Sequence, residues 1–180
     1  MKVFPTIPDK DIRIFLKELC QLSIDDGAEN ANDIEVSNIK FTGVDLDCPD
    51  NEQSFYYPKV LYKKDPIQDV LTEFQNAIVF SINNEHGLKK VYEITAKVES
   101  HCFYKNYHLA VGLAAGNCRN IFCSTRNSCQ AMTIGKGCAF PMIARPSIEA
   151  CNIDLELLAK ESQILDFNKD KTLLGMVFVN

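Results

Sequence analysis

Four cysteines stand close together in one polar segment of the chain, and their side chains are the residues best suited to chemistry. The segment covers residues 116–154, and its first part is rich in Gly, Asn, Ser and Thr. The four cysteines are Cys118, Cys123, Cys129 and Cys138. Four thiolates are the ligand number of a tetrahedral zinc site or of an iron–sulfur cluster. The sequence therefore predicts a metal-binding segment at 116–154, with these four thiols as the metal and cofactor ligands.

The spacing of these cysteines favours a cluster over a single ion. Four residues separate Cys118 from Cys123, five separate Cys123 from Cys129, and eight separate Cys129 from Cys138. Zinc ribbons use pairs of cysteines with two residues between them, and this segment has no such pair. A four-iron cluster is larger and accepts thiolates from several directions, so wide and unequal gaps suit it. We interpret the segment as a 4Fe–4S site, with structural zinc and unligated thiols as the alternatives.

Other cysteines give less indication of metal binding. Cys20 and Cys102 lie on apolar helical stripes, where a cysteine acts as a small buried hydrophobe. Cys48 precedes Pro49 in a predicted loop and has no second ligand within a few residues. We expect no disulfides, because the chain begins without the apolar stretch of an export signal and cytosolic thiols stay reduced.

Length and charge exclude several classes of protein. The 180 residues suffice for one core, so a single domain covering residues 1–180 is expected. The hydrophobic share of 46% and charged share of 24% are those of a globular protein. A net charge of -5 argues against nucleic-acid binding, which needs clustered cations. Without an apolar run of about 18 residues, the chain is predicted to be cytoplasmic and to have no membrane span.

Elements that position the cysteines follow from hydrophobic periodicity. The pattern predicts helices over 9–23 and 88–104, a helix that starts at Asp65-Pro66, and a helix capped by Asp154. It predicts strands over 34–44, 77–82, 109–115 and 173–179. Residues 25–33 are predicted to form a loop. This order indicates an α/β or α+β fold, with a mixed sheet covered by helices. If 109–115 is a central strand, the cysteine segment starts at its carboxyl end, where open sheets bind ligands.

Charged residues around the thiols suit a cluster that changes its charge. Cations in this segment would stabilise a reduced, more negative cluster. The cations are Arg119, Arg126, Lys136 and Arg145. Glu149 is expected to pair with Arg145. It is not assigned as a general base, since no second catalytic partner is evident.

Signatures of catalysis are missing from the sequence. The histidines do not flank a cysteine at a useful distance and are expected to be exposed or satisfied by hydrogen bonds. They are His86, His101 and His108. The chain has no phosphate-binding glycine loop, nucleophile elbow or HExxH motif. No catalytic residue is therefore assigned.

Residues 116–154 also resemble a known family. The cysteine series is followed by Cys-x-x-Pro at 138–141, then by Ala-Arg-Pro-Ser-Ile-Glu-Ala at 144–150 and Asn-Ile-Asp at 152–154. This order resembles the C-terminal motif of the predicted metal-binding proteins grouped as domain of unknown function 2284, which are common in anaerobic bacteria and archaea. The segments HLAVGLAAGN and LLGMVFVN are similar too, so the likeness covers roughly the last half of the chain.

The resemblance implies a metal or iron–sulfur role for the four loop cysteines and implies no reaction. The first half of the chain departs from the family, whose members tend to carry a cysteine-rich stretch ending in Cys-Pro-Pro there. In this sequence Cys48-Pro49 stands alone.

Three functions are consistent with these observations. The leading hypothesis is a cytoplasmic iron–sulfur protein of a low-oxygen organism, which exchanges electrons with a redox partner protein. A second is a zinc-stabilised interaction module without redox activity. A third is an enzyme with a substrate pocket beside the cluster, which uses Arg145 or Glu149. The sequence indicates no oligomeric state.

Overall fold

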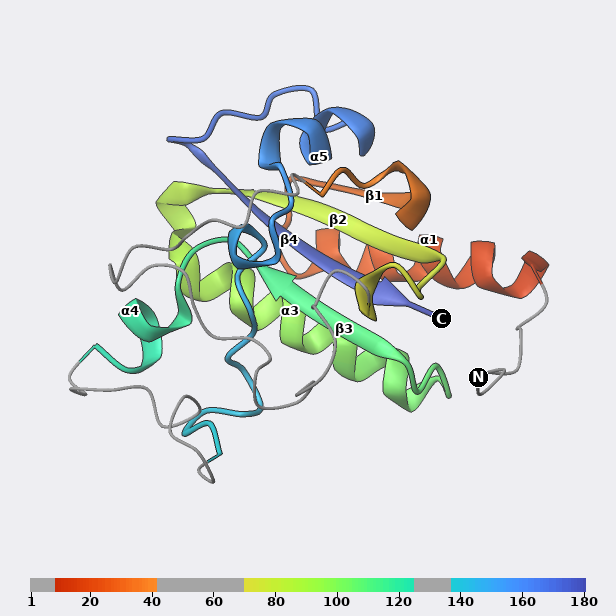
Figure 1. Cartoon of the computed structure of the whole chain (residues 1–180), viewed down its shortest axis with the longest axis horizontal. Helices are drawn as coiled ribbons and strands as arrows, with labels where there is room; N and C mark the ends of the chain where they lie inside the picture. Colours follow the sequence, from red (N-terminus) through yellow and green to blue (C-terminus); the bar gives the residue numbers. More distant parts are fainter. Residues whose placement is uncertain (1–8, 42–69, 125–136) are drawn as a thin grey trace.

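An antiparallel sheet forms the centre of the fold (Figure 1). The computed structural model describes residues 9–41, 70–124 and 137–180. In these residues the sheet has four strands in the order β1-β2-β4-β3. The strands are β1 (Asn30–Glu35), β2 (Asn76–Asn83), β3 (Ala110–Ala114) and β4 (Thr172–Val179). The last strand of the chain therefore lies between β2 and β3, and β3 forms an edge of the sheet.

Strand β2 is apolar on both faces because both faces of the sheet are covered. Successive side chains of a strand point to opposite faces. Ile78, Phe80 and Ile82 belong to one buried cluster, while Ala77 and Val79 belong to a second. All five side chains are fully buried. The uninterrupted apolar run of this strand thus reflects two hydrophobic cores that share one sheet.

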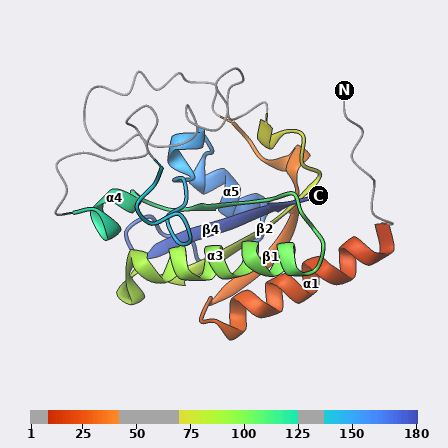
Figure 2. The same cartoon turned by 90° about the horizontal axis from the view of Figure 1, so that it is seen from below.

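Two long helices cover the first face of the sheet (Figure 2). These are α1 (Asp9–Asp25) and α3 (Gly87–Tyr104). Helix α1 buries Phe15 and Leu19, and α3 buries Val91, Ile94 and Val98, at the three- and four-residue spacings of one helical face. Burial of these side chains fixes α3 beneath β3 and β4, which matters for the candidate site.

Shorter helices cover the second face. They are the 3₁₀ turn η4 (Glu149–Cys151) and helix α5 (Leu155–Glu161). Asp154 caps α5, since its carboxylate accepts the N–H groups of Glu156 and Leu157 at 2.9 and 3.0 Å. Leu158 and Ala159 are buried against the second core. Two further 3₁₀ turns are η1 (Val36–Asn38) and η2 (Asn84–His86), and a short helix α4 (Cys118–Phe122) follows β3.

The α+β class predicted from the sequence is confirmed, with a difference in the sheet. Every strand pair in the described ranges is antiparallel, where a mixed sheet was expected. A parallel pairing occurs as an isolated bridge between Ala114 and Ser147. The strand expected over 109–115 is present as β3, and the condition that it is central is not met, because β4 takes the inner position between β2 and β3.

Strand β1 also differs from its prediction. It occupies Asn30–Glu35 rather than 34–44, and thus part of the expected loop at 25–33. Its side chains are mainly polar, and Asn32 donates a hydrogen bond to the carbonyl of Ser162 at 2.9 Å. Backbone pairing with β2 holds this edge strand, and such pairing leaves no hydrophobic alternation in the sequence.

Other elements agree with the prediction where they are described. The helices at 9–23 and 88–104 and the strands at 77–82 and 173–179 correspond to α1, α3, β2 and β4. The start of the helix expected at Asp65 lies outside the described residues, and residues 70 and 71 are helical. Cys48 lies outside them as well. No helix in the described ranges combines the length and apolar character that a membrane span needs.

Candidate metal centre

The first two cysteines lie at the two ends of a short helix. Helix α4 starts at Cys118, and Cys123 directly follows its last residue. Asn117 caps this helix by accepting the N–H of Arg119 at 2.8 Å. The sequence had predicted a loop here, because the polar composition around the cysteines conceals the Asn cap. The helix fixes the separation between the two thiols.

Gly116 forms a junction that fixes where α4 begins. Its φ of 77° lies in the left-handed region that favours glycine. The Tyr92 hydroxyl of α3 donates to its carbonyl oxygen at 2.7 Å. Its N–H donates to both carboxylate oxygens of Glu149, at 3.1 and 3.2 Å. Both peptide groups of Gly116 are thus held, one by α3 and the other by the chain after the cysteine segment.

The Tyr92 hydroxyl remains a donor across the physiological pH range. Burial raises the pKa of Tyr92 strongly, and the negative charges of Cys118 and Glu149 raise that pKa further. A protonated phenol can donate to the Gly116 carbonyl, whereas a phenolate cannot. Cys118 follows Gly116 by two residues, so it lies close to this junction.

A second arm of the segment carries Cys138. The Phe140 N–H donates to the Cys138 sulfur at 3.3 Å. The N–H groups of Ile143 and Ala144 both donate to the Phe140 carbonyl, at 3.2 and 2.9 Å. We call residues 138–144 the Cys138 turn. An N–H directed at a cysteine sulfur stabilises the thiolate, which is the form that binds metals.

Aromatic rings bring the two arms of the segment, α4 with Cys123 and the Cys138 turn, into contact. The Phe122 and Phe140 rings lie with their centroids 5.8 Å apart. Phe122 in turn packs edge-on against Tyr92 at 5.5 Å. Since Phe122 immediately precedes Cys123 and Phe140 follows Cys138 by two residues, the contact joins the chain segments that carry these thiols.

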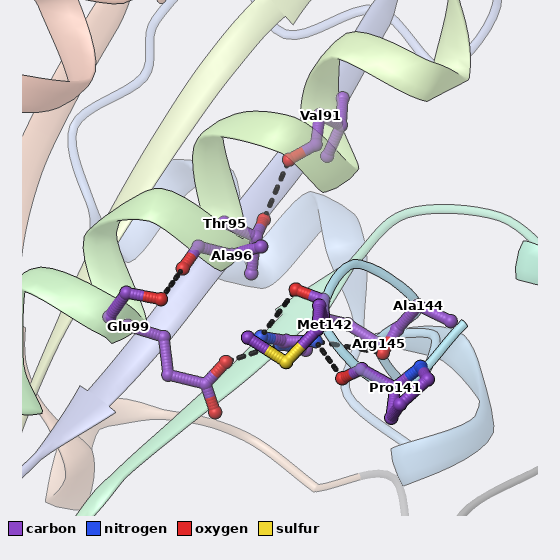
Figure 3. Close-up of polar contacts among 9 residues, drawn as sticks. Val91, Thr95, Ala96, Glu99, Pro141, Met142, Ala144 and Arg145 are labelled. Atoms are coloured by element: carbon purple, nitrogen blue, oxygen red, sulfur yellow. Dashed lines mark hydrogen bonds and ion pairs between the residues drawn. The ribbon is translucent and has the colours of Figure 1, made fainter. Parts of the chain in front are cut away.

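Arg145 attaches the Cys138 turn to helix α3 (Figure 3). Its Nε forms an ion pair with the Glu99 carboxylate. Its Nη1 donates to the carbonyls of Pro141 and Ala144 at 3.2 and 3.0 Å, and its Nη2 donates to the carbonyl of Met142 at 3.4 Å. The side chain of Arg145 is only 12% exposed. The arginine therefore holds the turn from its concave side.

Gly112 of β3 makes room for this attachment. A Cβ at this position would lie 2.6 Å from the Thr95 methyl group, 3.4 Å from a Glu99 carboxylate oxygen and 3.6 Å from Arg145 Cδ. Thr95 is fully buried and donates to the Val91 carbonyl at 2.8 Å, so its methyl group has little freedom to move. A glycine in this strand allows α3 and the Arg145 side chain to approach the sheet.

The structure describes three of the four predicted ligands. Cys118 and Cys138 are half-buried and Cys123 is 9% exposed. Cys129 lies outside the described residues, as do Arg126 and Lys136. Among the residues that the structure describes, no three His, Cys, Asp or Glu side chains are arranged as a metal site. The soft thiol donors, with an N–H directed at one of them, fit a thiophilic metal, and the four-thiolate set remains a prediction.

The remaining described thiols are unsuited to metal binding. Burial, together with the smaller effect of nearby carboxylates, raises the pKa of Cys20, Cys102 and Cys151 to about 12 in each case. Cys102 and Cys151 are buried in the two cores, and Cys20 is half-buried against the first core. Such thiols stay protonated at neutral pH, whereas metals bind the thiolate. The interpretation of Cys102 as a core residue is confirmed.

The structure corrects the expected partner of Glu149 and supports the expectation for one histidine. Glu149 does not pair with Arg145, because its carboxylate accepts the Gly116 N–H and Arg145 pairs with Glu99. The expectation of a satisfied histidine holds for His101, whose Nε2 lies 2.7 Å from a Glu18 oxygen.

Tyr92 and Glu99 were not identified from the sequence. The strongest pattern in α3 is its apolar stripe, which runs through Val91, Ile94 and Val98. Tyr92, Thr95 and Glu99 follow one another at spacings of three and four residues and so share a neighbouring face of the helix. A polar row beside an apolar stripe was the available signal. It marks the face of α3 that meets the cysteine segment.

Comparison with known proteins agrees with this geometry in general terms. Neither the curated proteins nor the solved structures include a match to the chain. Residues 30–179 match the model of a family described as predicted metal-binding protein (DUF2284). The match extends beyond the last half of the chain, where the resemblance was first seen, to the start of β1. Because the matched range covers most of the chain, the protein belongs to this family of predicted metal-binding proteins.

Proposed function

We propose that the protein binds a 4Fe–4S cluster through the thiolates of Cys118, Cys123, Cys129 and Cys138. The contact between Phe122 and Phe140, with ring centroids 5.8 Å apart, carries this proposal. It places two segments that are distant in sequence side by side, and each segment carries a thiol. Membership of a predicted metal-binding family supports a metal-binding role for the chain.

The donor set favours iron and sulfide over a single zinc ion. The three gaps between the four cysteines lack the close cysteine pairs with which zinc ribbons enclose one ion. The Phe140 N–H that reaches the Cys138 sulfur at 3.3 Å is a contact of the kind that tunes the reduction potential of cluster-bound thiolates. A structural zinc site in an interaction module would use the same four thiols, and it is the alternative to be tested.

Electron transfer is the role that such a cluster suits best. A cluster with every iron ligated by protein has no open position for a substrate, whereas it accepts and releases single electrons. We therefore propose a redox accessory role with a partner protein, in the cytoplasm of a low-oxygen organism. In this proposal the residues of the chain bind the cluster, and the Phe122–Phe140 contact holds together the segments that carry Cys123 and Cys138.

An enzyme that uses Arg145 or Glu149 is a weaker alternative. Arg145 is engaged by Glu99 and by three backbone carbonyls. Glu149 accepts the Gly116 N–H with both oxygens. Both side chains thus have structural partners at the base of the cysteine segment, which accounts for them without a substrate.

Metal analysis of protein purified without oxygen tests the proposal. We expect brown protein that contains iron and acid-labile sulfide in equal amounts and whose visible absorption is partly bleached on reduction. Colourless protein with stoichiometric zinc would support the interaction module. Protein without either metal after anaerobic reconstitution would overturn the proposal.

A further inference from the structure

We propose that Arg145 and Glu99 are positioning residues for the metal site, which fix the Cys138 turn against α3 before any metal binds. The inference rests on the proposed function, since it concerns how one of the four ligands is presented. Neither residue is a metal ligand in this proposal. Both act through the backbone that carries Cys138.

The contacts of Arg145 link a helix to a turn. A guanidinium presents its donors in a rigid planar fork. Here one edge faces the Glu99 carboxylate, and the other donors meet the carbonyls of Pro141, Met142 and Ala144 (Figure 3). Three carbonyls that point toward one centre repel each other unless a cation lies among them. The positive charge of Arg145 therefore offsets the repulsion among these carbonyls and stabilises the Cys138 turn.

The turn transmits this attachment to the thiol. Ile143 and Ala144 donate their N–H groups to the Phe140 carbonyl, and the Phe140 N–H reaches the Cys138 sulfur. The first two hydrogen bonds tie residues 143 and 144 to Phe140, and the third ties Phe140 to Cys138. Because these bonds link the residues of the turn in series, a displacement of residues 141–144 also displaces the sulfur.

The other end of the link is rigid. Glu99 belongs to α3, whose neighbouring residues Val98 and Thr95 are fully buried. Gly112 leaves no spare volume between β3, Thr95 and the ion pair. The exposed fractions of the Glu99 and Arg145 side chains are 25% and 12%. A pair that is this far removed from water is screened weakly by salt, so it persists at physiological ionic strength.

Fixing one ligand in advance improves metal binding. A site that is disordered before binding must lose conformational entropy when the metal arrives, and this loss reduces the affinity. An arm that is already ordered avoids that cost. The attachment therefore affects two separable quantities: the protection of the Cys138 turn in metal-free protein and the affinity for a metal.

Amide hydrogen exchange in the metal-free protein tests the first quantity. In Arg145→Ala we expect the amides of Ile143 and Ala144 to exchange roughly tenfold faster, the factor expected for losing one charge-assisted hydrogen bond. Arg145→Lys should resemble Arg145→Ala, because an ammonium can pair with Glu99 but cannot reach three carbonyls at once. Lys97→Met is the matched control, since it also removes a cation from an ion pair, with Asp26. Unchanged exchange in folded Arg145→Lys protein would overturn the inference.

Cobalt(II) titration tests the second quantity, with thiolate-to-cobalt charge-transfer absorption as the readout. We expect wild type and Lys97→Met to bind cobalt equally, and Arg145→Lys and Glu99→Gln to bind about tenfold more weakly, the same factor as in hydrogen exchange. Equal cobalt affinity in Arg145→Lys and wild type would refute the positioning role alone. Wild-type protein without thiolate–cobalt absorption would refute the part of the inference that concerns single-ion affinity, while iron and sulfide content after anaerobic reconstitution tests the proposed function separately.

Discussion

The Phe122 ring lies against the Phe140 ring across a gap of 18 residues in sequence, with 5.8 Å between the ring centroids. The contact ties the end of α4 to the Cys138 turn and brings the segments of Cys123 and Cys138 together. Aromatic pairs of this kind stabilise proteins by about 0.5–1.5 kcal/mol beyond the burial of their area.

A double-mutant cycle measures this contact. Phe122→Ala and Phe140→Ala should each lower the free energy of unfolding in urea, and their coupling energy should be about 1 kcal/mol. Leu165→Ala serves as the control, since Leu165 is 90% exposed and lies after α5. Its effect should add to that of Phe140→Ala. Additive effects of the two phenylalanine substitutions would show that the rings do not connect the arms.

Gly116→Ala should destabilise the protein and displace the start of α4. An alanine at a φ of 77° costs about 1–2 kcal/mol in backbone energy. Its Cβ would also lie 2.8 Å from Leu88 Cδ2. Gly137→Ala is the matched control next to a cysteine, because a Cβ there meets no atom within 4 Å. Thermal unfolding of both variants tests the difference, and equal melting temperatures would contradict the role of Gly116.

Three thiols should be unreactive in the native protein. A thiol with a pKa of about 12 is ionised to roughly one part in ten thousand at pH 8. Cys20, Cys102 and Cys151 all have pKa values near 12. Iodoacetamide followed by mass spectrometry should therefore leave them unmodified while it modifies Cys138, which is half-buried. Modification of Cys102 at the rate of Cys138 would show that the core assignment is wrong.

Glu18 should make the stability of the α1–α3 contact depend on acid pH. Hydrogen bonds from His101 and Lys105 hold the pKa of Glu18 below its ordinary value of 4.5. A carboxyl whose pKa is lowered by folding contributes stability above its unfolded pKa, and this contribution is lost as the pH falls through the folded pKa. Glu18→Gln should thus be less stable than wild type at neutral pH, and the difference should vanish at strongly acid pH. Urea unfolding along a pH series measures this difference, and a constant gap would contradict the assignment.

Much of the scaffold was predictable from the sequence because its apolar patterns are strong. The buried run of β2 and the stripe of Val91, Ile94 and Val98 leave few alternatives to a strand and a helix. The position of β3 was not predictable, since strand order depends on where β4 inserts at the end of the chain. Polar β1 was missed for a related reason, because most of its side chains are polar and its place in the sheet follows from backbone pairing with β2.

Prediction of the candidate site was limited in another way. The number and spacing of the cysteines indicate a metal site without any knowledge of three-dimensional contacts. The partners of Glu149 and Arg145, in contrast, depend on how the elements pack. Glu149 was expected to pair with Arg145, four residues before it, yet each meets a group more than 30 residues away. Local sequence cannot rank such partners, since the distances between them are set by the arrangement of α3, β3 and η4.

Metal content across a set of Cys→Ser variants tests the central claim most directly. Iron and acid-labile sulfide would be measured after anaerobic reconstitution of variants at Cys118, Cys123, Cys129 and Cys138, beside control variants at Cys20 and Cys102. The proposal predicts that each of the first four loses the cluster or holds it with a markedly altered spectrum, while both controls keep the wild-type content. Full iron and sulfide content with an unaltered spectrum in Cys123→Ser or Cys129→Ser, or equal metal loss in all six variants, would contradict it.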